Sequence, residues 1–132
     1  DLCTKPDTYW TDRLEAAAEK RGSWLLFAKR EKRLVGMVGA LKDEERHVAN
    51  ITAVFVAEEA RGPGIGTDLL SGLLRELRQD RTIQRLRLYV NKSQTAAVHL
   101  YHRCGFFIVE EDRATYGDGQ EHDGYVMERA VS

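Results

Sequence analysis

The sequence predicts one domain of mixed α/β class, in which helices and a central, partly antiparallel sheet make three layers. Its 132 residues suit a single domain, taken here as residues 1–132. Several segments of strand length are rich in apolar residues, and others repeat apolar residues at helical spacing. In the middle of the chain a strand, a glycine-rich turn, a helix and a second strand follow one another. This order predicts two parallel strands joined by a right-handed crossover.

The first half of the chain predicts a helix and then strands. Asp7 or Thr8 can cap a helix that runs to about Arg21 and that Gly22 stops. Strands of an antiparallel hairpin follow around a charged turn, and two glycines interrupt the second of them. A third strand has apolar residues that suggest burial on both of its faces. These strands are expected at 24–29, 34–41 and 49–56.

The second half predicts two helices and three strands. Five leucines form one stripe of a helix over 68–79, and apolar residues alternate over 85–90. A second helix over 95–103 ends at Gly105. The last strands are expected at 106–113 and 124–130, with a polar loop between them.

Composition argues against several kinds of partner. The net charge is −1 and 31% of the residues are charged, so we expect neither nucleic acid nor a membrane as partner. The chain lacks an apolar run of the ~20 residues that span a bilayer. It also lacks a signal-peptide pattern, so we expect a cytoplasmic protein. Cys3 and Cys104 lie far apart, and His99 and His102 have no evident third ligand, so we expect structural thiols and no metal.

The glycine-rich turn between residues 61 and 67 predicts a phosphate site. Its backbone amides would point outward at a helix N-terminus, which carries roughly half a positive elementary charge. A P-loop is excluded, because Gly66 stands where that motif needs a lysine before Thr67. A dinucleotide fingerprint is excluded as well, because its glycine spacing is not met and the next strand ends at Asn91 without an acid. We therefore expect a phosphorylated ligand of another kind.

Two motifs together indicate a family. The turn meets the pattern Q/R-x-x-G-x-G/A through Arg61, Gly64 and Gly66. A second pattern, N-x-x-A-x-x-L-Y-x-x-x-G-F, is met except that Gln94 replaces the asparagine. Its matching residues are Ala97, Leu100, Tyr101, Gly105 and Phe106. With both motifs in order, residues 49 to 130 resemble the GNAT superfamily of N-acetyltransferases. Members usually begin with a strand and a first helix, and the resemblance implies that this chain starts after them, either as a truncated or variant form or with Asp1 to Pro6 as a remnant of that start.

The resemblance implies transfer of an acetyl group from acetyl-coenzyme A to a primary amine, by direct attack in a ternary complex. In the family the sheet is splayed at the cofactor, where a strand with a bulge leaves its parallel neighbour. Tyr101 would be the general acid that protonates the leaving thiolate, and the Val56 N–H would bind the oxyanion. Contacts to the pantetheine arm are implied for Val54, Phe55, Val56 and Gln94. Backbone amides are implied to bind the pyrophosphate at Arg61, Gly62, Gly64, Ile65, Gly66 and Thr67.

Several points stay open. The general base is unassigned, with Glu44, Glu45 and His47 as candidates just before the third strand. The acceptor can be a small molecule or a peptide amine, and a homodimer is also open. A module that binds acyl-coenzyme A without catalysis is the main alternative function. A general nucleotide-phosphate binder is a third hypothesis, which the missing P-loop lysine disfavours.

Overall fold

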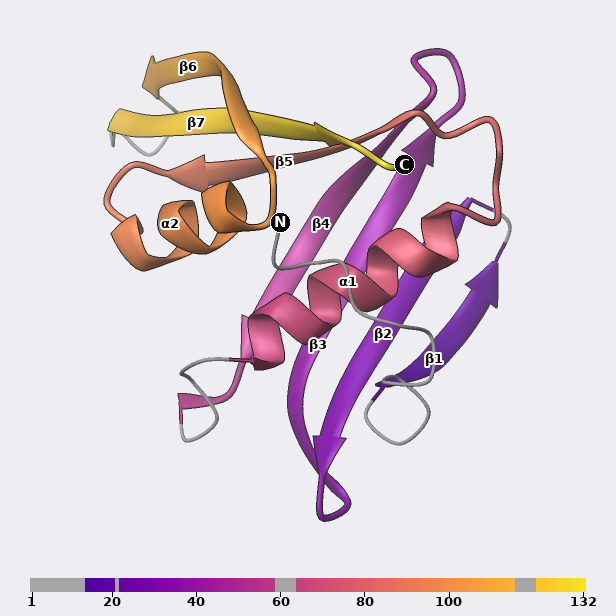
Figure 1. The fold of residues 1–132 in the computed structure, drawn as a ribbon. Helices are drawn as coiled ribbons and strands as arrows, with labels where there is room; N and C mark the ends of the chain where they lie inside the picture. The colour runs from indigo at the N-terminus through magenta and orange to yellow at the C-terminus, as the bar shows by residue number, and fades with distance from the viewer. Residues whose placement is uncertain (1–13, 21, 59–63, 116–120) are drawn as a thin grey trace.

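A computed structural model describes residues 14–20, 22–58, 64–115 and 121–132. In these residues, seven strands form one sheet in the order β1-β2-β3-β4-β5-β7-β6, and two helices pack on it (Figure 1). The elements are β1 (Leu14–Lys20), β2 (Ser23–Arg30), β3 (Arg33–Asp43), β4 (Val48–Val56), α1 (Ile65–Leu77), β5 (Arg85–Asn91), α2 (Thr95–Arg103), β6 (Phe107–Thr115) and β7 (Glu121–Ala130). Only β4 and β5 pair in parallel among these strands. The predicted mixed α/β class is confirmed.

The N-terminal helix is the main error of the sequence analysis. Its described part is the edge strand β1, which pairs antiparallel with β2 from Leu14↔Ala28 to Lys20↔Ser23. Gly22 adopts a φ of 81° and belongs to the tight connection between the two strands, so it is no helix cap. Cross-strand pairing here overrides the helix propensity of the Ala, Glu and Lys residues. The proposed caps, Asp7 and Thr8, lie outside the described residues.

The core lies between the sheet and α1. Figure 1 shows α1 crossing β2, β3 and β4. Its leucine stripe is fully buried, as predicted, and the members are Leu69, Leu70, Leu73, Leu74 and Leu77. Tyr101 and Phe106 belong to the same core, together with Leu88 of β5. The described residues therefore supply two of the three expected layers, with both helices on one face of the sheet. None of the helices in the described ranges is long and apolar enough to cross a membrane.

The opposite face of the sheet, which we call the second face, is less buried. Phe55 is 47% exposed and Tyr89 is 45% exposed. Thr52 is also exposed. The expectation that both faces of β4 are buried is therefore wrong, because the helices cover only one of them. The glycines of β3 do not interrupt that strand either.

Gly36 allows α1 to lie close to β3. A Cβ atom at Gly36 would lie 2.9 Å from Leu69 Cδ1 and 3.0 Å from the Phe55 carbonyl oxygen. Since Leu69 is fully buried and the Phe55 oxygen belongs to the backbone, neither can move far. The glycine thus sets the distance between helix and sheet.

We predict that Gly36→Ala lowers the free energy of unfolding by about 1–3 kcal/mol, the usual cost of overpacking. Gly124→Ala is the matched control, because its Cβ would meet the Tyr89 ring, but that ring is half exposed and can turn away. Urea unfolding measures the free energy of unfolding of both variants, and we expect Gly36→Ala to lose more of it than Gly124→Ala. A Gly36→Ala protein as stable as Gly124→Ala would contradict the packing argument.

An ion pair joins the end of β3 to the turn after α1. Lys42 Nζ lies 2.8 Å from Asp80 Oδ2, and Thr82 donates two hydrogen bonds to Asp80 Oδ1. The hydrogen bond from Lys42, with those from Thr82, lowers the pKa of Asp80 from 3.8 to about 2. A carboxyl group with a lowered pKa stabilises the fold above its unfolded pKa.

We predict that this contribution is full above pH 3.8 and is lost as the pH falls from 3.8 towards about 2. Asp80→Asn should remove that part of the acid dependence of stability. Thr82→Ala, which keeps the lysine pair, should remove less of it. Urea midpoints between pH 5 and about pH 2 provide the measurement, and an unchanged acid dependence in Asp80→Asn would refute the role of Asp80.

Candidate functional site

The site begins where β4 and β5 part. Their parallel pairing covers three residue pairs, from Val48↔Arg85 to Asn50↔Arg87. Beyond them β4 continues to Val56 on β3, and β5 continues to Asn91 on β7. Figure 1 shows β5 running away from β4 after this point. The sheet is therefore splayed between these strands, as the resemblance implied.

A bulge in β4 lies at the same place. Ala40 pairs with Ile51 and Gly39 pairs with Ala53, so Thr52 is the extra residue of β4. A bulge bends its strand and increases the local twist. It thereby helps to turn the second half of β4 away from β5.

The hydrogen-bond pattern of β3 and β4 shows which backbone groups point towards β5. Ala57 N donates to Val35 O at 2.8 Å, so these two residues form a hydrogen-bonded antiparallel pair. Because such pairs alternate along the strands, Phe55 also points its backbone groups at β3. Val54 and Val56 point theirs to the other side. Of the three predicted strand residues, two thus present N–H and C=O groups towards the parting strands.

Backbone groups alternate in direction along β5 as well, although no backbone group of β5 was predicted to belong to the site. Lys92 N donates to Asp123 O at 3.0 Å, so the alternation directs the backbone of Tyr89 and Asn91 towards β4. Asn91 is engaged locally, since its N–H donates to Gln94 Oε1 at 3.3 Å. The alternation of apolar residues in the sequence predicts which side chains of β5 lie on each face of the sheet. It does not predict which backbone groups point towards β4, because that depends on the pairing of β5 with β7.

The helix α1 starts beside the end of β4. Gly64 is the N-cap residue with a φ of 129°, which favours glycine. The first intrahelical bond runs from Asp68 N to Gly64 O at 2.7 Å. The amides of Ile65 and Gly66 precede that bond, and the first N–H groups of a helix have no carbonyl partner within it. The N-cap residue Gly64 makes no side-chain cap hydrogen bond, so the positive end of the helix dipole at this start suits an anion. Arg61 and Gly62 lie outside the described residues.

Gly66 brings α1 and α2 together. A Cβ atom at Gly66 would lie 2.8 Å from Leu100 Cδ2. The glycine therefore allows Leu100, and with it the neighbouring Tyr101, to lie close to the first turn of α1. The two motifs found in the sequence meet here in space. Leu100 was recognised as a motif residue, but nothing in the sequence indicated this contact.

Tyr101 packs in the core. Its side chain is 7% exposed, and its ring meets Phe106 edge to face with 5.8 Å between centroids. No hydrogen bond to the Tyr101 hydroxyl occurs among the described residues. Burial raises the pKa of Tyr101, and the nearby Cys104 adds to this. The phenol therefore keeps its proton throughout the neutral range, as a general acid must.

Gln94 precedes α2 and is hydrogen-bonded to Asn91 at the end of β5. Its side-chain oxygen accepts from Asn91 N, and its backbone N donates to Asn91 O at 3.0 Å. The side-chain oxygen is thus used to hold the end of β5 against the start of α2. The predicted contact of Gln94 with the pantetheine arm would therefore have to use the side-chain NH₂ group.

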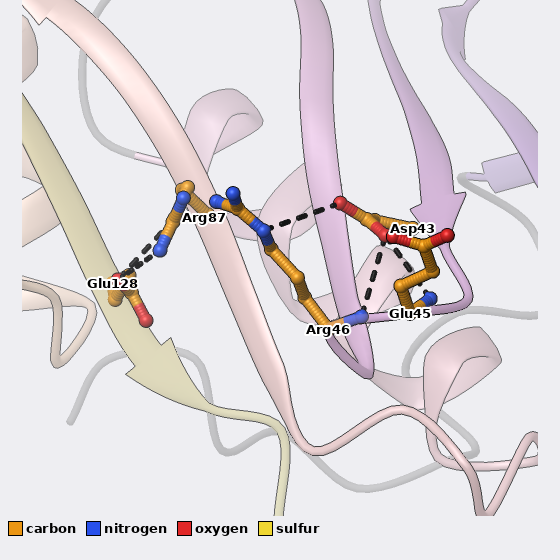
Figure 2. Close-up of polar contacts among 5 residues, drawn as sticks. All are labelled: Asp43, Glu45, Arg46, Arg87 and Glu128. Atoms are coloured by element: carbon orange, nitrogen blue, oxygen red, sulfur yellow. Dashed lines mark hydrogen bonds and ion pairs between the residues drawn. The ribbon is translucent and has the colours of Figure 1, made fainter.

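The three candidate bases lie at the wrong end of β4. Glu44, Glu45 and His47 are exposed and belong to the connection before Val48. Val56 is eight residues further along the strand, which corresponds to roughly 26 Å. Figure 2 shows this connection, where Asp43 Oδ1 accepts from the backbone N of Glu45 and Arg46. These side chains belong to the turn and do not reach the end of β4.

Glu128 of β7 is also unsuited to be a base. Burial raises its pKa, but hydrogen bonds from Arg85 and Arg87 outweigh that effect, so the pKa of Glu128 is lowered. This cluster of Arg85, Arg87 and Glu128 is not among the predicted site residues. Its only sequence signal is the alternation that places both arginines on one face of β5.

For metals, the described ranges contain no group of three His, Cys, Asp or Glu residues that could hold an ion.

Comparison with known proteins agrees with this geometry. The family model described as the Acetyltransferase (GNAT) family matches residues 2–106. An N-alpha-acetyltransferase of Saccharolobus solfataricus is 31% identical over 82 residues, which are 62% of this chain and 48% of that protein. A mycothiol acetyltransferase of Salinispora tropica is 34% identical over 109 residues, which are 80% of this chain and 33% of that protein. The chain thus spans half or less of these relatives.

Solved structures show the same fold. A ribosomal-protein-alanine N-acetyltransferase from Brucella melitensis has a TM-score of 0.72 and 29% identity, covering 83% of this chain and 70% of that one. A Bacillus anthracis protein solved in complex with acetyl coenzyme A has a TM-score of 0.78 and 19% identity, covering 85% and 64%. The second likeness concerns the fold alone. The splayed sheet, the glycine-started helix and the family match lead to one conclusion: this chain belongs to the GNAT acetyltransferase family.

Proposed function

We propose that this domain transfers an acetyl group from acetyl-coenzyme A to a primary amine within a ternary complex. The observation that carries the proposal is the backbone of β4 pointing into the parting of β4 and β5, beside the uncapped start of α1. Amides of Ile65, Gly66 and Thr67 would bind the pyrophosphate, together with those of Arg61, Gly62 and Gly64. Val54, Phe55, Val56 and Gln94 would contact the pantetheine arm.

The reaction needs little more from the protein. The neutral amine attacks the thioester carbonyl carbon, and the Val56 N–H would stabilise the oxyanion that forms. The C–S bond then breaks, and Tyr101 would give its proton to the departing thiolate. The amine proton passes to solvent, because none of the carboxylates considered above suits the role of base. The products are the acetylated amine and coenzyme A.

The acceptor is a small molecule or a peptide. Its class rests on family membership, since the relatives described above include an N-alpha-acetyltransferase and a mycothiol acetyltransferase. A homodimer is a further expectation, which light scattering would test. Binding of acyl-coenzyme A without any turnover would instead favour a non-catalytic module.

We predict that coenzyme A binds at least ~10-fold more tightly than pantetheine, because pantetheine lacks the phosphates that the start of α1 would hold. Calorimetry measures both affinities. Amide chemical shifts of Ile65 and Gly66 should move with coenzyme A and stay unchanged with pantetheine. ATP that displaced coenzyme A would instead support the general nucleotide-phosphate binder.

We predict that Tyr101→Phe lowers kcat about 10²–10⁴-fold, the usual contribution of a general acid. Affinity for coenzyme A should stay within a few-fold. Burial raises the pKa of Tyr101 above 10.0, so its hydroxyl should lose the proton only above pH 10.0. A fall in wild-type kcat that is caused by loss of the general acid should therefore occur only above that pH. Tyr125→Phe is a control outside the proposed machinery and should keep full turnover. Wild-type speed of Tyr101→Phe at every pH would exclude Tyr101 as the acid.

A further inference from the structure

The second face of the sheet carries a charged row at the point where β4 and β5 part. Paired residues of neighbouring strands point to the same face. The last parallel pair is Asn50↔Arg87, and Arg87 is paired in turn with Glu128 of β7. Tyr89 is the next residue of β5 on this face and has no β4 partner in the sheet. Arg87 thus lies at the vertex of the parting strands.

Glu128 fixes two arginines in place. Arg85 Nε donates to Glu128 Oε1 at 2.6 Å, and Arg87 Nη2 and Nε donate to Oε2 at 2.9 and 3.3 Å. Figure 2 shows the side chains of Arg87 and Glu128 pointing towards each other across β5 and β7. Both carboxylate oxygens are engaged, and the Glu128 side chain is 9% exposed. One buried negative charge therefore faces two guanidinium groups.

A positive charge and hydrogen-bond donors remain on Arg87. Its side chain is 33% exposed, and Nη1 makes no hydrogen bond to the described residues. A guanidinium that is already held in one orientation loses little conformational freedom when it binds an anion. Its planar donors match a carboxylate. The structure therefore presents an oriented anion-binding group on the second face.

This group lies on the side from which an acceptor can approach. On the other face, α1 and α2 meet through Gly66 and Leu100 beside buried Tyr101, and there the proposed function puts the coenzyme. Exposed Phe55 and Tyr89 flank the parting on the second face. Arg87 is two residues before Tyr89, or about 7 Å along β5. An amine that entered here would bring its neighbouring groups close to Arg87.

We propose that Arg87, oriented by Glu128, binds an anionic group of the acceptor, so that the domain prefers amines that carry a carboxylate nearby. This inference rests on the proposed function, since it assumes that the acceptor amine reacts between β4 and β5. For a peptide acceptor, the spacing fits an acidic side chain within the first few residues. Arg87 is then a specificity residue that touches the acceptor away from the reacting atoms.

The test uses two peptide amides that differ in one charge, Ala-Glu-Ala-Ala and Ala-Gln-Ala-Ala. Calorimetry with coenzyme A present measures binding, and acetyl-coenzyme A turnover gives kcat and KM. We expect the wild-type protein to bind the acidic peptide about five- to tenfold more tightly, as for a partly exposed charged hydrogen bond. Arg87→Gln should bring the two peptides within about twofold and leave the neutral peptide unchanged.

Arg46→Gln is the matched control. Arg46 has the same charge, and its side chain is 68% exposed and pairs with Asp43 instead of Glu128. This variant should keep the preference for the acidic peptide. If Arg87→Gln does not fold because it disturbs buried Glu128, the double variant with Glu128→Gln restores a neutral pair and should lose the preference equally.

Equal binding of the two peptides by the wild-type protein would overturn the inference. A preference that survives in Arg87→Gln, or one that Arg46→Gln abolishes as well, would also overturn it. Preferential binding of the acidic peptide through Arg87 without acetylation of either peptide would support the anion site and refute the proposed function. The two failures are thus distinguishable.

Discussion

The constraint on which the rest of the structure depends is the short parallel pairing of β4 and β5. The two strands share three residue pairs and then each follows its other neighbour. A buried strand edge must find partners for its backbone groups, because unpaired N–H and C=O groups are costly away from water. Strands that part turn some of their backbone groups towards the space between them. An extended ligand with amide groups is a suitable partner.

Packing keeps the strands apart. The bulge at Thr52 bends β4, and α1 lies close over β3 because Gly36 carries no side chain. Gly66 in turn allows Leu100 to approach the first turn of α1, which fixes α2 relative to the helix start. A helix start without a side-chain cap is thereby held next to diverging strands and a buried tyrosine. These parts of the site depend on two glycines that fill no space themselves.

The two faces of the sheet have different electrostatic characters. On the helix face, Asp68 is the buried acid in the first turn of α1, and burial keeps Tyr101 protonated. On the second face, the arginine pair keeps Glu128 ionised although it is nearly buried. The chemistry of the thioester and the selection of the acceptor would thus lie on opposite sides of one sheet. A change in acceptor specificity would then leave undisturbed the helix that is proposed to bind the carrier.

The sequence by itself determined the central elements and the family. The leucine stripe of α1, the bounds of α2 and the two motifs follow from local spacing, which does not depend on distant residues. It misassigned 14–20, because strand formation there depends on pairing with β2 and not on local propensity. Only the tertiary structure decided which backbone groups of Val54 and Val56 face β5, that the candidate bases are remote, and that Glu128 holds Arg87. Each of these depends on which strands lie side by side, and residues far apart in the chain settle that.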